Sequence, residues 1–476
     1  MKIFISALLL IFAFGNTRAQ DVFIGTWSGK LNVGPGLRLV IHVKKNANGI
    51  LQATMDSPDQ KVMDIPFTMV RTNGDSLITF MDKIQGGYSG KITDANFISG
   101  VWTQGGKRME LNLMHGETEN VNLAPKPKPQ TPQPPFAYKS IDTVYYNKDK
   151  SQQFGATLTM PNGAGPFPAI LLITGSGLQN RDEEIMGHKP FAVLADFLTK
   201  NGYAVLRVDD RSIGKSTGDV INATSADFAD DANCSIDFLL TINEVNKKKI
   251  GLLGHSEGAM IAPMLANKRN DIAFIIMMAG PGEKVSTLMT EQSEMVMRSY
   301  GVDAASIKAY SPLYNNIITL IASSKNDEDL KPAITEIVAN WVKNTDTATV
   351  SKFIGDVASG DDKKFAEQFA NLSKQKWSHF FFSYDPSNNL RKLHCKVLAI
   401  NGSRDIQVKA STNLAAINAN LAKSKSPAFE VKELEGLNHL FQTCNNCTTS
   451  EYKDLEETIS PLALKIIADW LAKNVK

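Results

Sequence analysis

The sequence lacks a surplus of charge of either sign, since its 476 residues include 51 lysines and arginines against 49 aspartates and glutamates. A near-neutral balance gives no general attraction to nucleic acid or to an anionic membrane surface. It also lacks a convincing internal repeat beyond a rhythm of short strands, which argues against a repeat architecture. We therefore expect a folded chain of two or three domains that binds a small or medium-sized neutral molecule.

No apolar run is long enough to span a bilayer. The longest N-terminal run, Ile3 to Phe14, follows a lysine and precedes Thr17-Arg18-Ala19. It falls short of the ~20 residues that a transmembrane helix needs, and it has the charge and small-residue pattern of a cleaved signal peptide. No cysteine follows it, so a lipid anchor is not indicated. We expect residues 1–19 to be removed and the mature protein to be exported, periplasmic or secreted, without a membrane span.

Cysteine is scarce, with four in the chain. Cys444 and Cys447 in TCNNCTT could close a short loop, whereas Cys234 and Cys395 fall in a helical pattern and at the start of a strand. A thioredoxin-type site would need the pair at a helix N-terminus, and a zinc site would need two further ligands. The sequence shows neither feature. We therefore favour a disulfide that closes a short loop, and we expect no metal.

The rhythm of the sequence changes twice. Residues 20–123 alternate short β-rich runs with turn dipeptides, which predicts an all-β domain, either a sandwich or a barrel. Residues 124–135 are so rich in proline that we expect an extended, poorly packed polyproline II linker. Residues 136–476 alternate strands and helices, with a helix interrupted by Pro263. This pattern predicts a mostly parallel sheet covered by helices on both faces.

One serine lies between two glycines where an apolar strand gives way to a helix, in the segment GLLGHSEGAMI. A strand that turns directly into a helix strains its central residue and leaves no room for side chains at the flanking positions. Gly254 and Gly258 satisfy that requirement, so Ser256 is the candidate nucleophile. The helix N-terminus beneath its hydroxyl would stabilise negative charge.

A serine nucleophile needs a histidine base oriented by an acid. In this architecture the acid and then the histidine follow the serine, each on a loop after a later strand. Asp405 follows the strand KVLAI and His439 follows VKELE, so both match. Asp209 or Asp210 is a rival acid that breaks the expected order. His255 is expected to point away from the nucleophile.

The oxyanion of an acyl-transfer intermediate is usually bound by two backbone N–H groups. One should come from Glu257, the residue after the nucleophile. The second should come from the loop after ILLIT, where either Gly177 or Ser176 could supply it. Gly214–Gly218 lacks the first glycine of a phosphate loop, and 175–177 lacks the third glycine of a dinucleotide site. We therefore expect no cofactor.

Residues from about 136 to 476 resemble the α/β-hydrolase superfamily, and specifically its bacterial serine esterase and serine-aminopeptidase-like branch, with dienelactone hydrolases and acyl-CoA thioesterases as relatives. The resemblance rests on ITGSGLQNRDE, DDRSIGKSTGD, GHSEG, NGSRD and GLNH. It implies Ser256 as nucleophile, Asp405 as acid, His439 as base, and Gly177 with Glu257 as oxyanion donors. It also implies a helical cap, expected at about 283–390, over the catalytic face. Met and aromatic side chains of the cap could line an acyl pocket, although most should pack in the core of the cap.

These expectations together describe an exported serine hydrolase that cleaves carboxylic esters through an acyl-enzyme. The first alternative keeps the triad and changes the bond, making the protein a serine aminopeptidase or other peptidase. That activity needs an acidic pocket for a substrate amine, for which Glu257, Asp182 and 183–184 are candidates. The second alternative is a carbohydrate- or surface-binding protein with a vestigial hydrolase domain.

Overall fold

The computed structural model of the protein describes residues 21–475, apart from gaps at 32–36, 47–48, 61, 85, 95, 105–106, 117–127 and 326–327. The expected signal peptide and the first part of the proline-rich linker lie outside the described residues. The described chain divides into two compact units. No helix within the described residues is long and apolar enough to cross a membrane.

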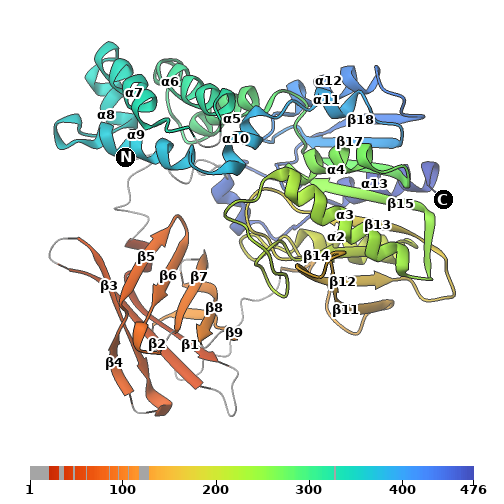
Figure 1. Ribbon diagram of the computed structural model, residues 1–476, viewed down its shortest axis with the longest axis horizontal. Helices are drawn as coiled ribbons and strands as arrows, with labels where there is room; N and C mark the ends of the chain where they lie inside the picture. The colour runs from red at the N-terminus through yellow and green to blue at the C-terminus, as the bar shows by residue number, and fades with distance from the viewer. Residues whose placement is uncertain are drawn as a thin grey trace. The chain divides into compact units, whose positions relative to one another are not determined.

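The first unit is one antiparallel sheet that forms a half-barrel (Figure 1). The strands run in the order β4-β3-β2-β1-β10-β8-β7-β6-β5, and β9 pairs with β8. Trp27, Trp102 and Leu113 are buried in its single core. The barrel-like alternative is thus nearer to the structure than a sandwich of two sheets. The strands are β1 (Gly25–Leu31), β2 (Leu37–Lys45), β3 (Leu51–Ser57), β4 (Val62–Pro66), β5 (Met69–Asn73), β6 (Ser76–Phe80), β7 (Gly86–Asp94), β8 (Phe97–Gln104), β9 (Lys107–Glu110) and β10 (Leu113–His115).

The second unit is built on an eight-stranded mixed sheet in the order β11-β12-β14-β13-β15-β16-β17-β18 (Figure 1). The pairs β11–β12 and β12–β14 are antiparallel, and the other five neighbours are parallel. Parallel strands place their carboxyl ends at one edge, where the following loops meet. The strands are β11 (Lys139–Tyr146), β12 (Gln153–Met160), β13 (Phe167–Ile173), β14 (Ala204–Val208), β15 (Val245–His255), β16 (Ile272–Met278), β17 (Lys396–Gly402) and β18 (Phe429–Leu434).

Helices cover both faces of this sheet because its central strands are apolar on both sides. On one face Leu171 and Leu252 share a core with α3 (Ser225–Thr241) and α4 (Glu257–Lys268). On the opposite face the adjacent residues Ile170 and Leu253 share a second core with helices α2 and α13. These two helices are Pro190–Lys200 and Pro461–Asn474. The expected two-faced burial is therefore observed.

A helical insertion lies between β16 and β17, where the sequence predicts helical patterns. Its helices are α5 (Val285–Ser299), α6 (Ala304–Ser323), α7 (Lys331–Asn344), α8 (Thr347–Phe353), α9 (Asp361–Leu372), α10 (Lys376–Ser383) and α11 (Ser387–Leu390). Met289, Met297 and Phe382 are buried in the continuous core of this unit. The remaining helix, α12 (Ala410–Leu421), packs beside β17 and β18.

One local expectation is wrong. Helix α4 is not interrupted at Pro263 but runs through it, since burial of the whole helix face outweighs the one backbone hydrogen bond that proline cannot make. The described part of the linker, 128–135, has no buried residue, but Gln130 anchors it to the chain just before α13. The Gln130 amide accepts from the backbone N–H groups of Thr458 and Ile459 and donates to the Ile459 carbonyl. The side chain of Gln130 thereby forms hydrogen bonds with backbone groups just before α13.

Candidate active site

Ser256 occupies the sharp turn between β15 and α4, with φ 53° and ψ −115°. A non-glycine residue with positive φ is uncommon and costs on the order of 1–3 kcal/mol, so such strain is typical of functional turns. The flanking glycines have the steric role that the sequence predicts. A Cβ on Gly254 would lie 2.1 Å from the Gly258 carbonyl oxygen, and one on Gly258 would lie 2.1 Å from the Ile173 carbonyl oxygen. Neither position has room for a side chain.

His439 and Asp405 meet at the same edge of the sheet, on the loops after β18 and β17. The Nδ1 atom of His439 lies 2.8 Å from Oδ2 of Asp405, and both residues are buried. The other carboxylate oxygen, Oδ1, accepts from the backbone N–H groups of Gln407 at 2.7 Å and Val408 at 2.9 Å. Three donors thus hold the carboxylate in place, and its contact fixes the proton of His439 on Nδ1.

His255 lies next to both Ser256, the expected nucleophile, and His439, the expected base. The rings of His255 and His439 lie 4.9 Å apart, and His255 directly precedes Ser256. Within the described chain no hydrogen bond joins the Ser256 hydroxyl to the His439 imidazole. Catalytic hydrogen bonds are often long in unliganded enzymes and tighten when substrate binds.

The two alternative acids, Asp209 and Asp210, interact with residues other than His439. Asp209 is paired with Arg181 at 2.7 Å, and the backbone N–H of Arg181 donates to it as well. Asp210 accepts from the Thr174 hydroxyl at 2.7 Å and from the Gln179 N–H at 2.8 Å. Burial raises the pKa of Asp210 to about 8. Neither carboxylate is hydrogen-bonded to His439.

The expected oxyanion donors have free N–H groups in the described structure. The backbone N–H groups of Ser176, Gly177 and Glu257 donate to no acceptor among the described residues. In contrast, the N–H of Gly175 donates to Oε1 of Glu183 at 2.6 Å and is therefore occupied. Gly177 has φ +97°, a conformation that favours glycine. The alternatives Gly177 and Ser176 stay open.

The side chain of Glu257 is buried. Its Oε1 accepts from the Ser225 hydroxyl at 2.5 Å and from the indole N–H of Trp377 at 2.9 Å. Burial raises the pKa of this carboxyl above its ordinary range. Trp377 belongs to α10 of the helical insertion, so this contact ties the insertion to the first residue of the nucleophile helix.

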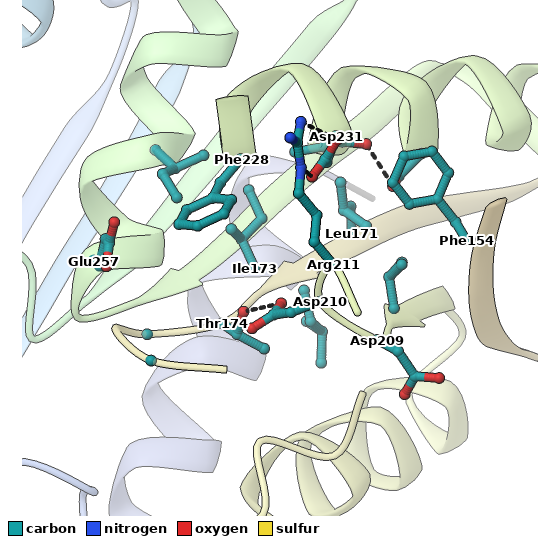
Figure 2. Close-up of a pocket in the computed structure, with 17 residues that line it drawn as sticks. Phe154, Leu171, Ile173, Thr174, Asp209, Asp210, Arg211, Phe228, Asp231 and Glu257 are labelled. Carbon is teal, nitrogen blue, oxygen red and sulfur yellow. Dashed lines mark hydrogen bonds and ion pairs between the residues drawn. The ribbon is translucent and has the colours of Figure 1, made fainter. Parts of the chain in front are cut away.

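A small cavity of about 60 Å³ lies beside the loop that carries the expected oxyanion donors (Figure 2). Its lining includes Gly175, Gly177 and Glu257 together with apolar side chains, among them Phe154 and Phe228. Asp210 lines it as well and is hydrogen-bonded to Thr174 (Figure 2). No Met or aromatic side chain of the helical insertion is among the described residues that line this cavity.

Sequence reasoning missed one pair beside the nucleophile. The Nδ1 atom of His255 lies 3.1 Å from Oε1 of Glu183, and its Nε2 atom lies 3.0 Å from the carbonyl oxygen of His439. Glu183 was expected only as a possible binder of a substrate amine. No short motif in the sequence connects two residues 72 positions apart. Within the described ranges, no cluster of three or more His, Cys, Asp or Glu side chains could hold a metal ion.

A strained serine on a strand–helix turn, at the edge of a mixed sheet with helices on both faces, is the defining feature of the α/β-hydrolase class. Residues 151–425 match the X-Pro dipeptidyl-peptidase (S15) family, which is more than half of the 476 residues. The chain belongs to this family. The resemblance to the esterase and peptidase branch of the α/β-hydrolases is thereby confirmed, and the protein is a hydrolase.

Among curated proteins, the chain is 32% identical over 135 residues to esterase EstD of Thermotoga maritima, covering 28% of this chain and 32% of that protein. It is 27% identical over 195 residues to acyl-coenzyme A thioesterase 3 of Mus musculus, covering 40% of each chain. It therefore spans about a third to two fifths of these relatives. Among solved structures, an esterase of Pyrococcus furiosus matches 72% of this chain and 92% of its own at 16% identity, with a TM-score of 0.42.

Proposed function

We propose that the protein is an exported serine hydrolase that cleaves carboxylic esters through an acyl-enzyme, with Ser256, His439 and Asp405 as the catalytic triad. Ser256 attacks the ester carbonyl while Nε2 of His439 takes its proton, and Asp405 stabilises the imidazolium that forms. The N–H groups of Glu257 and of Gly177 or Ser176 receive the oxyanion. His439 then returns the proton to the leaving alcohol and activates a water molecule for deacylation.

The observation that carries this proposal is the 2.8 Å contact between His439 and Asp405 at the sheet edge that holds the strained Ser256. In the neutral imidazole this contact holds the proton on Nδ1, so that Nε2 is available as a base. The esterase and thioesterase names of the curated relatives agree with an ester or thioester bond. The helical insertion serves as a cap over the catalytic face, and export follows from the N-terminal segment 1–19.

The experiment is hydrolysis of p-nitrophenyl esters of graded acyl length by the wild-type protein and by Ser256→Ala. We expect Ser256→Ala to lose at least about three orders of magnitude in kcat. A fluorophosphonate probe should label the folded wild-type protein at Ser256 and should not label the variant. Full esterase activity in Ser256→Ala, or no labelling of Ser256, would show that another group performs the reaction.

A second candidate, a serine aminopeptidase or dipeptidyl-peptidase with the same triad, is favoured by one observation. Glu257 and Asp210 line the cavity beside the oxyanion loop, and neither carboxyl has a cation as hydrogen-bond partner among the described residues. A substrate ammonium group could supply the missing charge and would favour the ionised form of both carboxyls. The family description names a dipeptidyl-peptidase as well.

The two candidates are separated by comparing kcat/KM for p-nitrophenyl butyrate with that for amino-acid and X-Pro p-nitroanilides. The ester proposal expects the butyrate to be the better substrate by at least about tenfold and to be insensitive to added free amino-acid amides. The reverse preference, with competitive inhibition by the amides, would replace it with the peptidase candidate.

A further inference from the structure

His255 and Glu183 connect the two loops that flank the nucleophile. Oε1 of Glu183 accepts from the N–H of Gly175 at 2.6 Å and contacts Nδ1 of His255 at 3.1 Å. Nε2 of His255 lies 3.0 Å from the carbonyl oxygen of His439. The chain of contacts therefore begins on the oxyanion loop after β13 and ends on the backbone of the base after β18.

These contacts bear on which nitrogens of the His255 imidazole carry protons. A carbonyl oxygen can only accept, so Nε2 of His255 must carry a proton to bond His439. When Glu183 is ionised, its Oε1 accepts from the N–H of Gly175 and keeps a second lone pair, which accepts the Nδ1 proton of His255. An imidazole that donates from both nitrogens is a cation. With an ionised Glu183, the pair is a buried imidazolium and carboxylate.

The surroundings of the pair are mostly apolar and offer few other hydrogen-bond partners. Apart from Glu183 and His255, the small cavity at the pair is lined by apolar side chains, namely Pro190, Phe191, Leu194, Met278, Leu440, Phe441 and Ile459. The charged or titratable groups that face His255 are Glu183, His439 and, at longer range, Asp405. Burial alone would lower the pKa of His255, but the charge and hydrogen bond of Glu183, with the His439 carbonyl, raise it above its ordinary value.

We propose that Glu183 and His255 are a positioning pair, which fixes the oxyanion loop through Gly175 and the base through the main chain of His439. The inference rests on the proposed function, because it assigns the pair a role in that reaction. Neither side chain needs to touch substrate. By holding the N–H of Gly175, Glu183 leaves the next N–H groups of the loop free for the oxyanion. By holding the carbonyl of His439, His255 sets the height of the imidazole above Ser256.

The first test is kinetic and uses Glu183→Gln and His255→Gln. Glutamine at 183 keeps an acceptor for Gly175 but removes the charge that keeps His255 doubly protonated. Because a displacement of about 1 Å can cost a factor on the order of 100 in rate, we expect kcat for an ester to fall about 10- to 100-fold with KM changed less than about threefold. The matched controls are Glu367→Gln and His394→Gln, two exposed residues outside the site, which should keep wild-type kcat.

The double variant separates positioning from general stability. Since the two residues act as one unit, Glu183→Gln with His255→Gln should lose no more kcat than the worse single variant, within about threefold. Fluorophosphonate labelling of Ser256 should slow in parallel. Retention of kcat within twofold in either folded single variant, or losses that multiply in the double variant, would overturn the proposal.

The second test uses the wild-type protein, so it stands even where a variant fails to fold. In protein labelled with 15N-histidine, the His255 imidazole should have protons on both nitrogens at pH 8, where an ordinary imidazole of pKa about 6.5 is about 97% neutral. A singly protonated His255 would overturn the pair. A doubly protonated His255 in a protein that neither hydrolyses esters nor reacts with the fluorophosphonate would instead leave the pair intact and refute the proposed function.

Discussion

Replacing Asp405 with asparagine removes the charge of the acid while keeping its shape. Oδ1 of Asp405 accepts from the N–H groups of Gln407 and Val408, and Oδ2 faces Nδ1 of His439. In Asp405→Asn the amide oxygen must take the position of Oδ1, because the amide nitrogen cannot accept from two N–H donors. The amide NH₂ then points at Nδ1 of His439 and forces that nitrogen to become an acceptor.

The result is the wrong tautomer of the base. His439 would carry its proton on Nε2, the nitrogen that must take the proton of Ser256. The same substitution in the well-studied serine protease triad lowers kcat by about four orders of magnitude, which is about 5 kcal/mol at 1.36 kcal/mol per decade. The folded protein loses one charge-assisted hydrogen bond of about 2 kcal/mol and keeps the two backbone bonds at position 405. Activity should therefore fall far more than stability.

The assay is hydrolysis of p-nitrophenyl butyrate, with thermal unfolding measured on the same samples. We expect kcat for Asp405→Asn to be about 10⁻³ to 10⁻⁴ of wild type with a nearly unchanged KM. Asp230→Asn, which alters an exposed carboxylate paired with Lys268, is the matched control and should be fully active. A folded Asp405→Asn protein with more than about a tenth of the wild-type kcat would refute the assignment of the acid.

Three further predictions concern the surroundings of the site. Trp377→Phe keeps an aromatic ring but removes the donor to Glu257, so kcat should fall about fivefold, as expected for one hydrogen bond of about 1 kcal/mol; unchanged ester kinetics would contradict this link. The disulfide Cys444–Cys447 closes a loop of sequence separation 3, so reduction should cost about 2 kcal/mol of unfolding free energy, seen as a lower Tm with reductant. Burial lowers the pKa of His188 to about 4, so its neutral form stabilises the fold fully above pH 6.5 and this stability is lost as the pH falls toward 4. Tm should drop across that window by the equivalent of at most about 3 kcal/mol, and the drop should shrink in His188→Gln.

Local steric rules made the nucleophile turn predictable. Only glycine fits at 254 and 258, because a Cβ there would strike the backbone of Gly258 or of Ile173. The order of strands likewise predicted that Asp405 and His439 would meet, since each directly follows a parallel strand of one sheet. These features depend on short segments and on the fixed geometry of strands, both of which the sequence displays directly.

Packing between distant segments was not predictable in the same way. Proline content favoured a loose linker, but it gave no sign of the hydrogen bonds of Gln130 with backbone groups of Thr458 and Ile459, more than 300 positions away. Pro263 should weaken a helix, yet α4 is buried along its length and continues. In α4 tertiary packing outweighs a local preference.

The pair of Glu183 and His255 explains why a second histidine can stand beside the base without competing with it. Both nitrogens of His255 are already engaged, one by a carboxylate and one by a carbonyl, so it has no lone pair with which to accept the serine proton. His439 keeps Nε2 free because Asp405 occupies only Nδ1. The roles of two neighbouring imidazoles are therefore set by the acceptors around them, and replacing Glu183 with glutamine should change the protonation of His255 and leave that of His439 unchanged.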